Sequence, residues 1–329
     1  MVDPLHPDQE TIQQAATLIK QGQVVGFPTE TVYGLGADAT NNEAVERIYS
    51  AKHRPPDNPL ISHFTSMEEI QQFTVNIPEL AYQLADQFWP GPLTMVLNKN
   101  EKISPLVTQG LDTLAVRIPA HPVALALIAA AGVPIAAPSA NLSGKPSPTT
   151  AAHVYKDLAG IIPMILDGGS TAIGVESTVI NLTSSTPILL RPGGLTIEEL
   201  REVIPNLKVT SGTPSGTPLS PGMKYTHYSP TTPLILVTDG FGMDASAIDE
   251  IAHNHGSKPL ILCTNPGHSH ELPVLQLGAT FREIQVNLFA CLRLLDDRDH
   301  DVGIFEAIEA VKEGFAVMNR VRKAAHQVI

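Results

Sequence analysis

GFPTETVYGLG, residues Gly26–Gly36, is the stretch around which we organise the fold prediction. Before it, the β-branched and aromatic residues of QVVGF (Gln23–Phe27) predict a short buried strand. After it, Asn41 or the asparagine that follows can cap a helix over 43–50, where apolar residues recur at helical spacing. The stretch is therefore expected to be a strand-to-helix turn near the start of an α/β chain.

The residues of this turn indicate a ligand site. Pro28 fixes one backbone angle, and Gly34 and Gly36 permit positive φ, so the main chain can come close to a ligand. Thr29 and Thr31 add hydroxyl groups that donate and accept hydrogen bonds. Small anions commonly bind at such junctions. A well-built turn without any ligand explains the same residues about equally well.

Length and composition narrow the class of protein. A chain of 329 residues suggests two domains, and a hydrophobic content of 43% is ample for packed cores. The formal net charge of −12 argues against an extended basic surface for nucleic acid or an anionic membrane. The two cysteines, Cys263 and Cys291, lie in apolar surroundings and indicate buried thiols in a reducing compartment. With no secretory pattern at the N-terminus and no apolar run of membrane-spanning length, we expect a cytoplasmic protein.

The order of predicted elements gives the domain organisation. Helices and strands follow one another without strict alternation over 1–209, which predicts an α/β fold of the α+β kind, a mixed twisted sheet with helices packed on it. Residues 210–233 are rich in proline, glycine, serine and threonine and predict a linker. Apolar strand runs alternate with helical patterns over 234–329 and predict a smaller α/β, Rossmann-like domain.

Two pairs of polar residues with a spacing of two are candidate site residues. Lys52 and Arg54 fall in a proline-rich loop, and on an extended segment both side chains would face one way and could receive a polyanion. Ser139 and Asn141 have the same spacing where a strand ends. A solvated loop and an ordinary polar turn are the plainer explanations of the two pairs.

Two arginines lie in apolar strands. Arg117 is inside one predicted strand and Arg191 ends another, and a buried guanidinium needs an anion, which is either a side chain or a ligand. A structural salt bridge explains each arginine alone. Both arginines together with the two spaced pairs favour a shared anionic site.

Other motifs are absent or weak. The sequence contains no P-loop, CxxC, HExxH or GxSxG pattern. Residues 34–39 fit a dinucleotide fingerprint with Asp57 downstream, but the glycines come too late after the strand. The histidine pairs at 253 and 255 and at 268 and 270 fall in polar loops without a nearby acid cluster, so we expect them to be solvated.

Seven motifs occur in one order along the chain: FPTETVYGLGADA, KHRPPDNPL, WPGPLT, VRIPAHP, APSANLSGKPSPT, STVINL and RPG. As a set they closely resemble the YrdC-like family of threonylcarbamoyl-adenylate synthases. The linker segment SPGMKYTHYSP and the ending GFAVMNRVRKAA resemble the longer, two-domain members of that family. The resemblance covers nearly the whole chain and includes the Lys52, Arg54, Ser139 and Asn141 positions.

The resemblance implies an enzyme that makes threonylcarbamoyl-AMP and pyrophosphate from L-threonine, bicarbonate and ATP, for threonylcarbamoyladenosine modification of tRNA. Magnesium would be carried by the ATP phosphates, with no metal held by the protein. A separate transferase would act on tRNA, so weak or no tRNA binding is expected. The implied catalytic residues are Lys52, Arg54, Ser139 and Asn141; the implied ATP-binding residues are Arg54, Asn58, Thr113, Ser139, Ser147, Arg191, His227 and Tyr228, the last two in a lid formed by the linker; and the implied threonine-binding residues are Thr31, His63, Arg117, Ala137 and Ser177.

Two other functions remain open from the sequence. A related domain occurs in carbamoyl-transferring enzymes of hydrogenase maturation, but those also carry zinc-binding regions that two cysteines cannot build. A double-stranded RNA-binding or ribosome-associated module is the non-enzymatic alternative, and the net charge of −12 counts against it.

Overall fold

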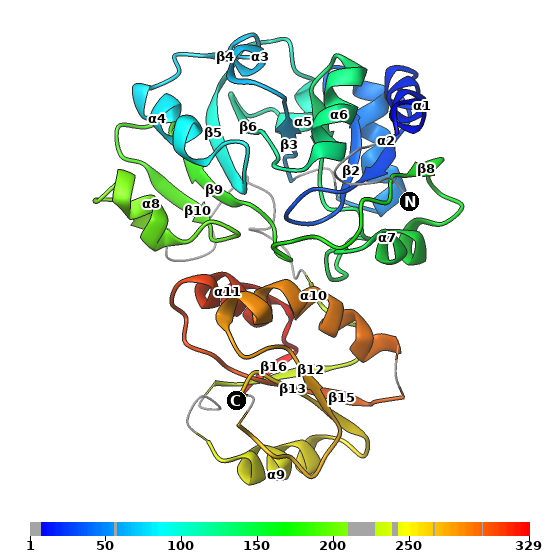
Figure 1. Ribbon diagram of the computed structural model, residues 1–329, viewed down its shortest axis with the longest axis vertical. Helices are drawn as coiled ribbons and strands as arrows, with labels where there is room; N and C mark the ends of the chain where they lie inside the picture. The colour runs from blue at the N-terminus through cyan, green and yellow to red at the C-terminus, as the bar shows by residue number, and fades with distance from the viewer. Residues whose placement is uncertain (1–7, 56–57, 210–227, 239–242, 266, 298) are drawn as a thin grey trace. The chain divides into compact units, whose positions relative to one another are not determined.

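The computed structural model describes residues 8–55, 58–209, 228–238, 243–265, 267–297 and 299–329 (Figure 1). These residues form two compact units. The first unit takes most of residues 8–209, and the second takes 228–329 together with the short segments 144–147 and 173–175. Each unit has a sheet of its own.

The first unit is built on a mixed sheet. Within the described residues it has eleven strands in the order β11-β10-β9-β5-β6-β3-β7-β2-β1-β8, with β4 paired to β5. Parallel and antiparallel pairs alternate irregularly, which confirms the predicted mixed sheet. The strands are β1 Val25–Phe27, β2 Gly34–Asp38, β3 Ile61–His63, β4 Thr74–Val75, β5 Leu93–Lys99, β6 Thr113–Arg117, β7 Ile135–Ala137, β8 Met164–Ile165, β9 Thr178–Asn181, β10 Ile188–Arg191 and β11 Lys208–Val209.

Helices cover this sheet. They are α1 Gln9–Lys20, α2 Asn42–Lys52, α3 Met67–Gln71, α4 Glu79–Phe88, α5 Pro105–Thr108, α6 Pro122–Ala131, α7 Ala151–Leu158 and α8 Ile197–Val203. One face of α1, with Ile12, Ala15 and Ile19, packs with α6 on strands β1 and β7 in a single apolar cluster. Helix ends follow their local sequence: the Asn41 side chain caps α2, and Thr196 begins α8 with a capping box.

The predicted strand-to-helix turn is wrong in its second half. Strands β1 and β2 form an antiparallel hairpin, so Gly34 and Gly36 lie in a strand and not in a turn. Neither glycine has positive φ. Glycine is required at position 36 for space, because a Cβ there would lie 2.7 Å from Cγ2 of Ile135 and 2.8 Å from Cε1 of Phe27. The turn is confined to residues 28–33.

The described residues of the second unit contain a parallel sheet of five strands in the order β14-β13-β15-β12-β16, which confirms the α/β prediction for this part of the chain. In Figure 1, α9 lies on one face of this sheet, and α10 and α11 lie on the other. The elements are β12 Leu234–Val237, α9 Ala245–His255, β13 Pro259–Cys263, β14 Val274–Gln276, α10 Phe281–Asp297, β15 Val302–Glu306, α11 Glu313–Ala324 and β16 Gln327–Val328.

Among the described residues, no helix combines the length and apolar character that crossing a membrane requires. Cys263 and Cys291 are both buried and form no disulfide within the described residues, which agrees with the predicted buried thiols.

Candidate active site

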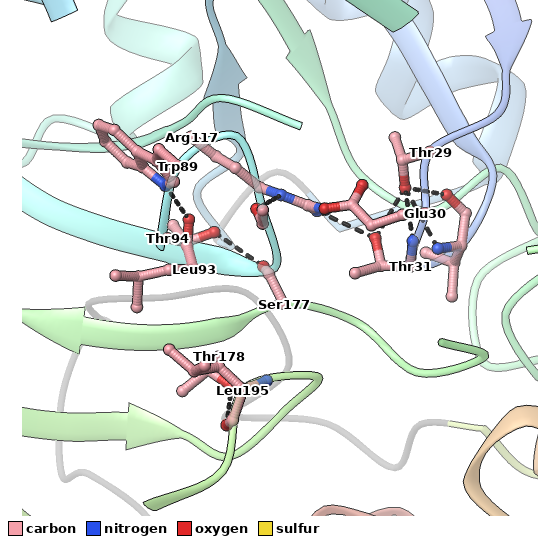
Figure 2. A network of polar contacts seen from close by, with 12 residues as sticks. Thr29, Glu30, Thr31, Trp89, Leu93, Thr94, Arg117, Ser177, Thr178 and Leu195 are labelled. Atoms are coloured by element: carbon pink, nitrogen blue, oxygen red, sulfur yellow. Dashed lines mark hydrogen bonds and ion pairs between the residues drawn. The ribbon is translucent and has the colours of Figure 1, made fainter. Parts of the chain in front are cut away.

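A buried ion pair lies at the centre of the candidate site (Figure 2). Arg117, the last residue of β6, places Nη2 at 2.7 Å from Oε1 of Glu30. The same guanidinium donates from Nε to the carbonyl of Gly91 at 3.1 Å and from Nη1 to the hydroxyl of Thr31 at 3.0 Å. Arg117 is 3% exposed and Glu30 is 8% exposed, so both charges are held away from water.

The loop that carries Glu30 is held by its own threonines. Oγ1 of Thr29 lies 2.7 Å from Oγ1 of Thr31, donates to the carbonyl of Val32 at 2.6 Å, and accepts from the backbone N–H groups of Thr31 and Val32. Strands β1 and β2 fix both ends of the loop. The side chains between them are therefore pre-positioned in the absence of ligand.

His63 lies beside Arg117, because β3 and β6 are parallel partners in which these two residues are paired. Burial, followed by the nearby Arg117 charge, lowers the pKa of His63 to about 3. Its Nδ1 lies 3.3 Å from the carbonyl of Ile135. His63 is thus neutral at physiological pH and offers a polar but uncharged wall.

Ser177 and Arg191 form a second contact group. Arg191 donates from Nε and Nη2 to the carbonyl of Ser177 at 3.1 and 2.9 Å, and Nη2 also reaches the Ser177 hydroxyl at 3.2 Å. That hydroxyl lies 2.7 Å from Oγ1 of Thr94. Figure 2 shows Ser177 and Thr94 on one side of Arg117, and Glu30 and Thr31 on the other.

Lys52 does not lie on an extended segment as predicted. It is the last residue of α2, and His53 follows in a left-handed conformation with φ 51° that ends the helix before Arg54. The Nζ of Lys52 donates to the carbonyls of Ser139 and Asn141 and lies 3.5 Å from Oδ1 of Asn141. The lysine therefore ties the Ser139–Asn141 segment to the end of α2.

The side chains of Ser139 and Asn141 lie on the same side of the chain, as their spacing predicts, since the Ser139 hydroxyl donates to Oδ1 of Asn141. The segment also touches the threonine loop: the N–H of Ala140 donates to the carbonyl of Tyr33 at 2.9 Å, and Ser139 pairs with Gly34. The loop 28–33 therefore connects the Ser139–Asn141 segment, which Lys52 contacts, with the residues that contact Arg117.

Asn58 is a candidate ligand-binding residue. It is 1% exposed, and neither its amide nitrogen nor its amide oxygen has a hydrogen-bond partner among the described residues. The half-buried Arg54 donates from Nη2 to the backbone carbonyl of Asn58 at 3.3 Å, so its guanidinium lies beside the backbone of Asn58. Unsatisfied buried amides are costly unless a bound molecule completes them.

The remaining predicted residues are spread more widely. Ala137 is buried at the end of β7, and Thr113 is the half-buried first residue of β6. Ser147 is buried and groups with the second unit. Tyr228 also belongs to the second unit, where its ring stacks on Phe289 at 5.2 Å. His227 lies outside the described residues.

Sequence reasoning missed Glu30 and Thr94. Glu30 was not singled out because a glutamate between two threonines in a turn is typical of a solvated loop. The signal that could have found it was Arg117, which requires a buried anion and was recognised without its partner.

Comparison with known proteins places the chain. Residues 17–193 match the family model for Sua5, YciO and YrdC proteins, described as "Telomere recombination". The chain belongs to this family. Residues 195–326 match the model of the C-terminal domain of threonylcarbamoyl-AMP synthase.

Similar proteins match both parts of this chain. It is 49% identical over 320 residues to the threonylcarbamoyl-AMP synthase of Pyrococcus abyssi, a match that covers 95% of this chain and 94% of the relative. It is 46% identical to the Bacillus subtilis enzyme of the same name, over 99% and 96% of the two chains. The crystal structure of P. abyssi Sua5 complexed with L-threonine superposes with a TM-score of 0.91 at 45% identity, over 98% of this chain and 97% of the other.

Proposed function

We propose that this chain is a threonylcarbamoyl-AMP synthase, a nucleotidyltransferase that forms threonylcarbamoyl-AMP and pyrophosphate from L-threonine, bicarbonate and ATP. The observation that carries the proposal is the match to enzymes of this name at 49 and 46% identity over nearly the whole of both chains. The buried cations and unsatisfied amide of the first unit supply what such a reaction needs.

We assign the threonine subsite to Arg117, Thr31, His63, Ala137 and Ser177. The relative crystallised with L-threonine supports this choice of ligand. A guanidinium has five N–H donors, and the described contacts of Arg117 to Gly91, Thr31 and Glu30 use three of them. Two donors remain for a substrate carboxylate, which suits planar, two-point recognition.

Glu30 determines the orientation of an amino acid in this subsite. Its Oε1 pairs with Arg117, and its buried Oε2 has no hydrogen-bond partner within the described part of the chain. An ammonium group placed at Oε2 would satisfy that oxygen. The carboxylate and amino groups of an amino acid would then bind at adjacent positions, the first on Arg117 and the second on Glu30.

We assign the nucleotide subsite to Arg54, Asn58, Thr113, Ser139, Ser147, Arg191, His227 and Tyr228, with Lys52 and Asn141 beside it. Lys52 contributes positive charge and holds the Ser139–Asn141 segment in place, since its donors point at the carbonyls of that segment. Mg²⁺ enters with ATP as part of the substrate. The Asn58 amide is available to a base, ribose or phosphate oxygen.

The chemistry needs positioning more than a protein nucleophile. The threonine ammonium group first loses a proton to solvent. The free amine then attacks bicarbonate and forms a carbamate with loss of water. A carbamate oxygen then attacks the α-phosphorus of ATP, and the bond to the bridging oxygen breaks to release pyrophosphate. Fixed positive charges stabilise the charge that develops at phosphorus.

The product serves tRNA threonylcarbamoyladenosine modification, and a separate transferase consumes it. The net charge of −12 supports little or no direct tRNA binding by this chain. The predicted lid belongs to the linker 210–233, of which residues 210–227 lie outside the described residues.

Pyrophosphate release from ATP tests the proposal. We expect release that requires both bicarbonate and L-threonine and that falls when glycine replaces threonine. Mass spectrometry should identify the adenylate product. Pyrophosphate release that does not depend on threonine would overturn the assignment in favour of a carbamoyl-transferring activity. A gel shift with double-stranded RNA at physiological salt would favour the RNA-binding alternative.

A further inference from the structure

A buried cluster of metal-ligand side chains lies in the second unit, outside the proposed synthase site. Cys263 ends β13 and Glu306 ends β15, and these strands are parallel neighbours whose carboxyl ends meet at one edge of the sheet. His270 comes from the loop after β13. One ligand atom from each of the three residues lies within 4.8 Å of the others. The carboxyl ends of parallel strands are the usual place for a bound group.

The prediction that His268 and His270 are solvated is wrong. The His270 side chain is 0% exposed and that of His268 is 17% exposed. The prediction failed because the acids that accompany them come from distant positions, Asp249 on α9 and Glu306 on β15.

Two carboxylates contact the imidazole of His270, one at each ring nitrogen. Its Nδ1 lies 2.8 Å from Oδ1 of Asp249, and its Nε2 lies 3.0 Å from Oε1 of Glu306. A neutral imidazole has one N–H group, so it can donate to only one of these carboxylates. If Nδ1–H donates to Asp249, then Nε2 and Oε1 face each other as two lone pairs. A cation between them resolves the conflict.

Both carboxylates are fixed for this role. The backbone N–H of Thr264 donates to Oε2 of Glu306 at 2.8 Å, which leaves Oε1 directed at His270 and His268. The backbone N–H of Glu271 donates to Oδ2 of Asp249 at 2.8 Å. A carboxylate that holds the second nitrogen of a ligating histidine is the usual outer-shell partner of a metal ion.

We propose that Cys263, His270 and Glu306 bind one divalent transition-metal ion of the zinc type, with Asp249 as the residue that positions His270. Sulfur, nitrogen and oxygen donors together suit Zn²⁺ and exclude Mg²⁺, which requires oxygen ligands. Three protein ligands leave one position of a tetrahedral site open. The ion would join β13, β15 and the loop between β13 and β14 that carries His270.

Cobalt substitution of the full chain tests this site. Chelator-treated protein titrated with Co²⁺ should bind one equivalent with visible absorption bands of tetrahedral cobalt and a sulfur-to-cobalt charge-transfer band, and Zn²⁺ should abolish both bands. Mg²⁺ in large excess should have no effect. Because the readout is spectroscopic, failure of this proposal and failure of the proposed synthase activity are separate outcomes.

Matched variants locate the ion. Cys263→Ser should lose the charge-transfer band, whereas Cys291→Ser, which changes the other buried cysteine, should keep it. His270→Ala should abolish tight binding, and His255→Ala, an exposed histidine on α9, should leave it unchanged. Asp249→Asn should keep the band but weaken affinity by about 10–100-fold.

The proposal is wrong if wild-type protein gives no tetrahedral cobalt spectrum. It is equally wrong if the band survives in Cys263→Ser. Circular dichroism verifies that each variant is folded. Should Cys263→Ser be unfolded, Glu306→Gln decides the matter: weakened cobalt binding supports the site, and unchanged binding overturns it.

Discussion

Arg117 and Glu30 lie 2.7 Å apart with both side chains at least nine-tenths buried. They come from different parts of the sheet, Arg117 from the end of β6 and Glu30 from the loop between β1 and β2. An isolated charge of either sign would be very unfavourable at this depth, so each residue requires the other. The pair fixes the loop to the sheet and at the same time directs unused donors and an unused oxygen into the candidate site.

Replacing Glu30 tests the ion pair. In Glu30→Gln the Arg117 charge stays buried without its anion, so we expect the free energy of unfolding to fall by about 3–5 kcal/mol, measured by urea denaturation. Glu10→Gln, an exposed position on α1, is the control and should change it by less than about 0.5 kcal/mol. Equal stability of the two variants would show that the pair contributes nothing to folding.

Replacing Lys52 tests the anchored Ser139–Asn141 segment. Lys52→Met removes a positive charge and the donors to two carbonyls, and we expect kcat/KM for ATP to fall about 10²–10³-fold in the pyrophosphate assay. Lys20→Met, at the exposed end of α1, should behave as wild type. Undiminished pyrophosphate release by Lys52→Met would remove the lysine from the site.

The buried neutral His63 should make folding stability depend on pH. Its pKa is lowered from 6.5 to about 3 by burial and by Arg117, so between these values the unfolded chain binds a proton that the folded chain does not. Stability should therefore fall as the pH falls through this window, by about 1.4 kcal/mol per pH unit from this residue.

The His63 contribution is measured as the difference between wild type and His63→Asn in chemical denaturation at several pH values. His255→Asn, at the exposed end of α9, serves as the control. Identical pH slopes for wild type and His63→Asn would mean that His63 is protonated in the folded protein.

Gly36→Ala tests why glycine occupies β2. The added methyl would overlap Ile135 and Phe27, and we expect a loss of about 1–3 kcal/mol in the free energy of unfolding. Gly26→Ala in the adjacent strand meets its nearest side-chain atom at 3.3 Å and should cost less. The two thermal midpoints measured side by side give the comparison, and a smaller loss at position 36 than at position 26 would contradict the packing argument.

Local patterns predicted the local structure well. The helix predicted over 43–50 follows from apolar spacing, and its cap at Asn41 follows from residue type. The hairpin was mistaken for a turn because GLGAD lacks the β-branched residues that indicate a strand, and its burial comes from neighbours that the sequence places far away. Strand β15 was missed because a five-residue run with a glycine and a glutamate has no clear period.

The candidate site, too, could be predicted from the sequence only in part. The sequence singled out Arg117 because a cation in an apolar strand needs a partner. It singled out Lys52, Ser139 and Asn141 by the spacing of two within their polar pairs. It could not supply the partners, because Glu30 meets Arg117 and Lys52 meets the Ser139 and Asn141 carbonyls only through tertiary structure.

The strand order of the first unit has a consequence for how the chain folds. Strand β1 pairs with β8 through Val25 and Met164, and β5 pairs with β9 through Leu93 and Thr178. Strands β1 and β5 thus gain these partners only after residues 164 and 178 have been synthesised. Such distant pairings slow folding, since loop closure precedes the contacts that reward it. Until residue 181 has emerged from the ribosome, the nascent chain carries these unpaired strand edges, and exposed edges favour aggregation.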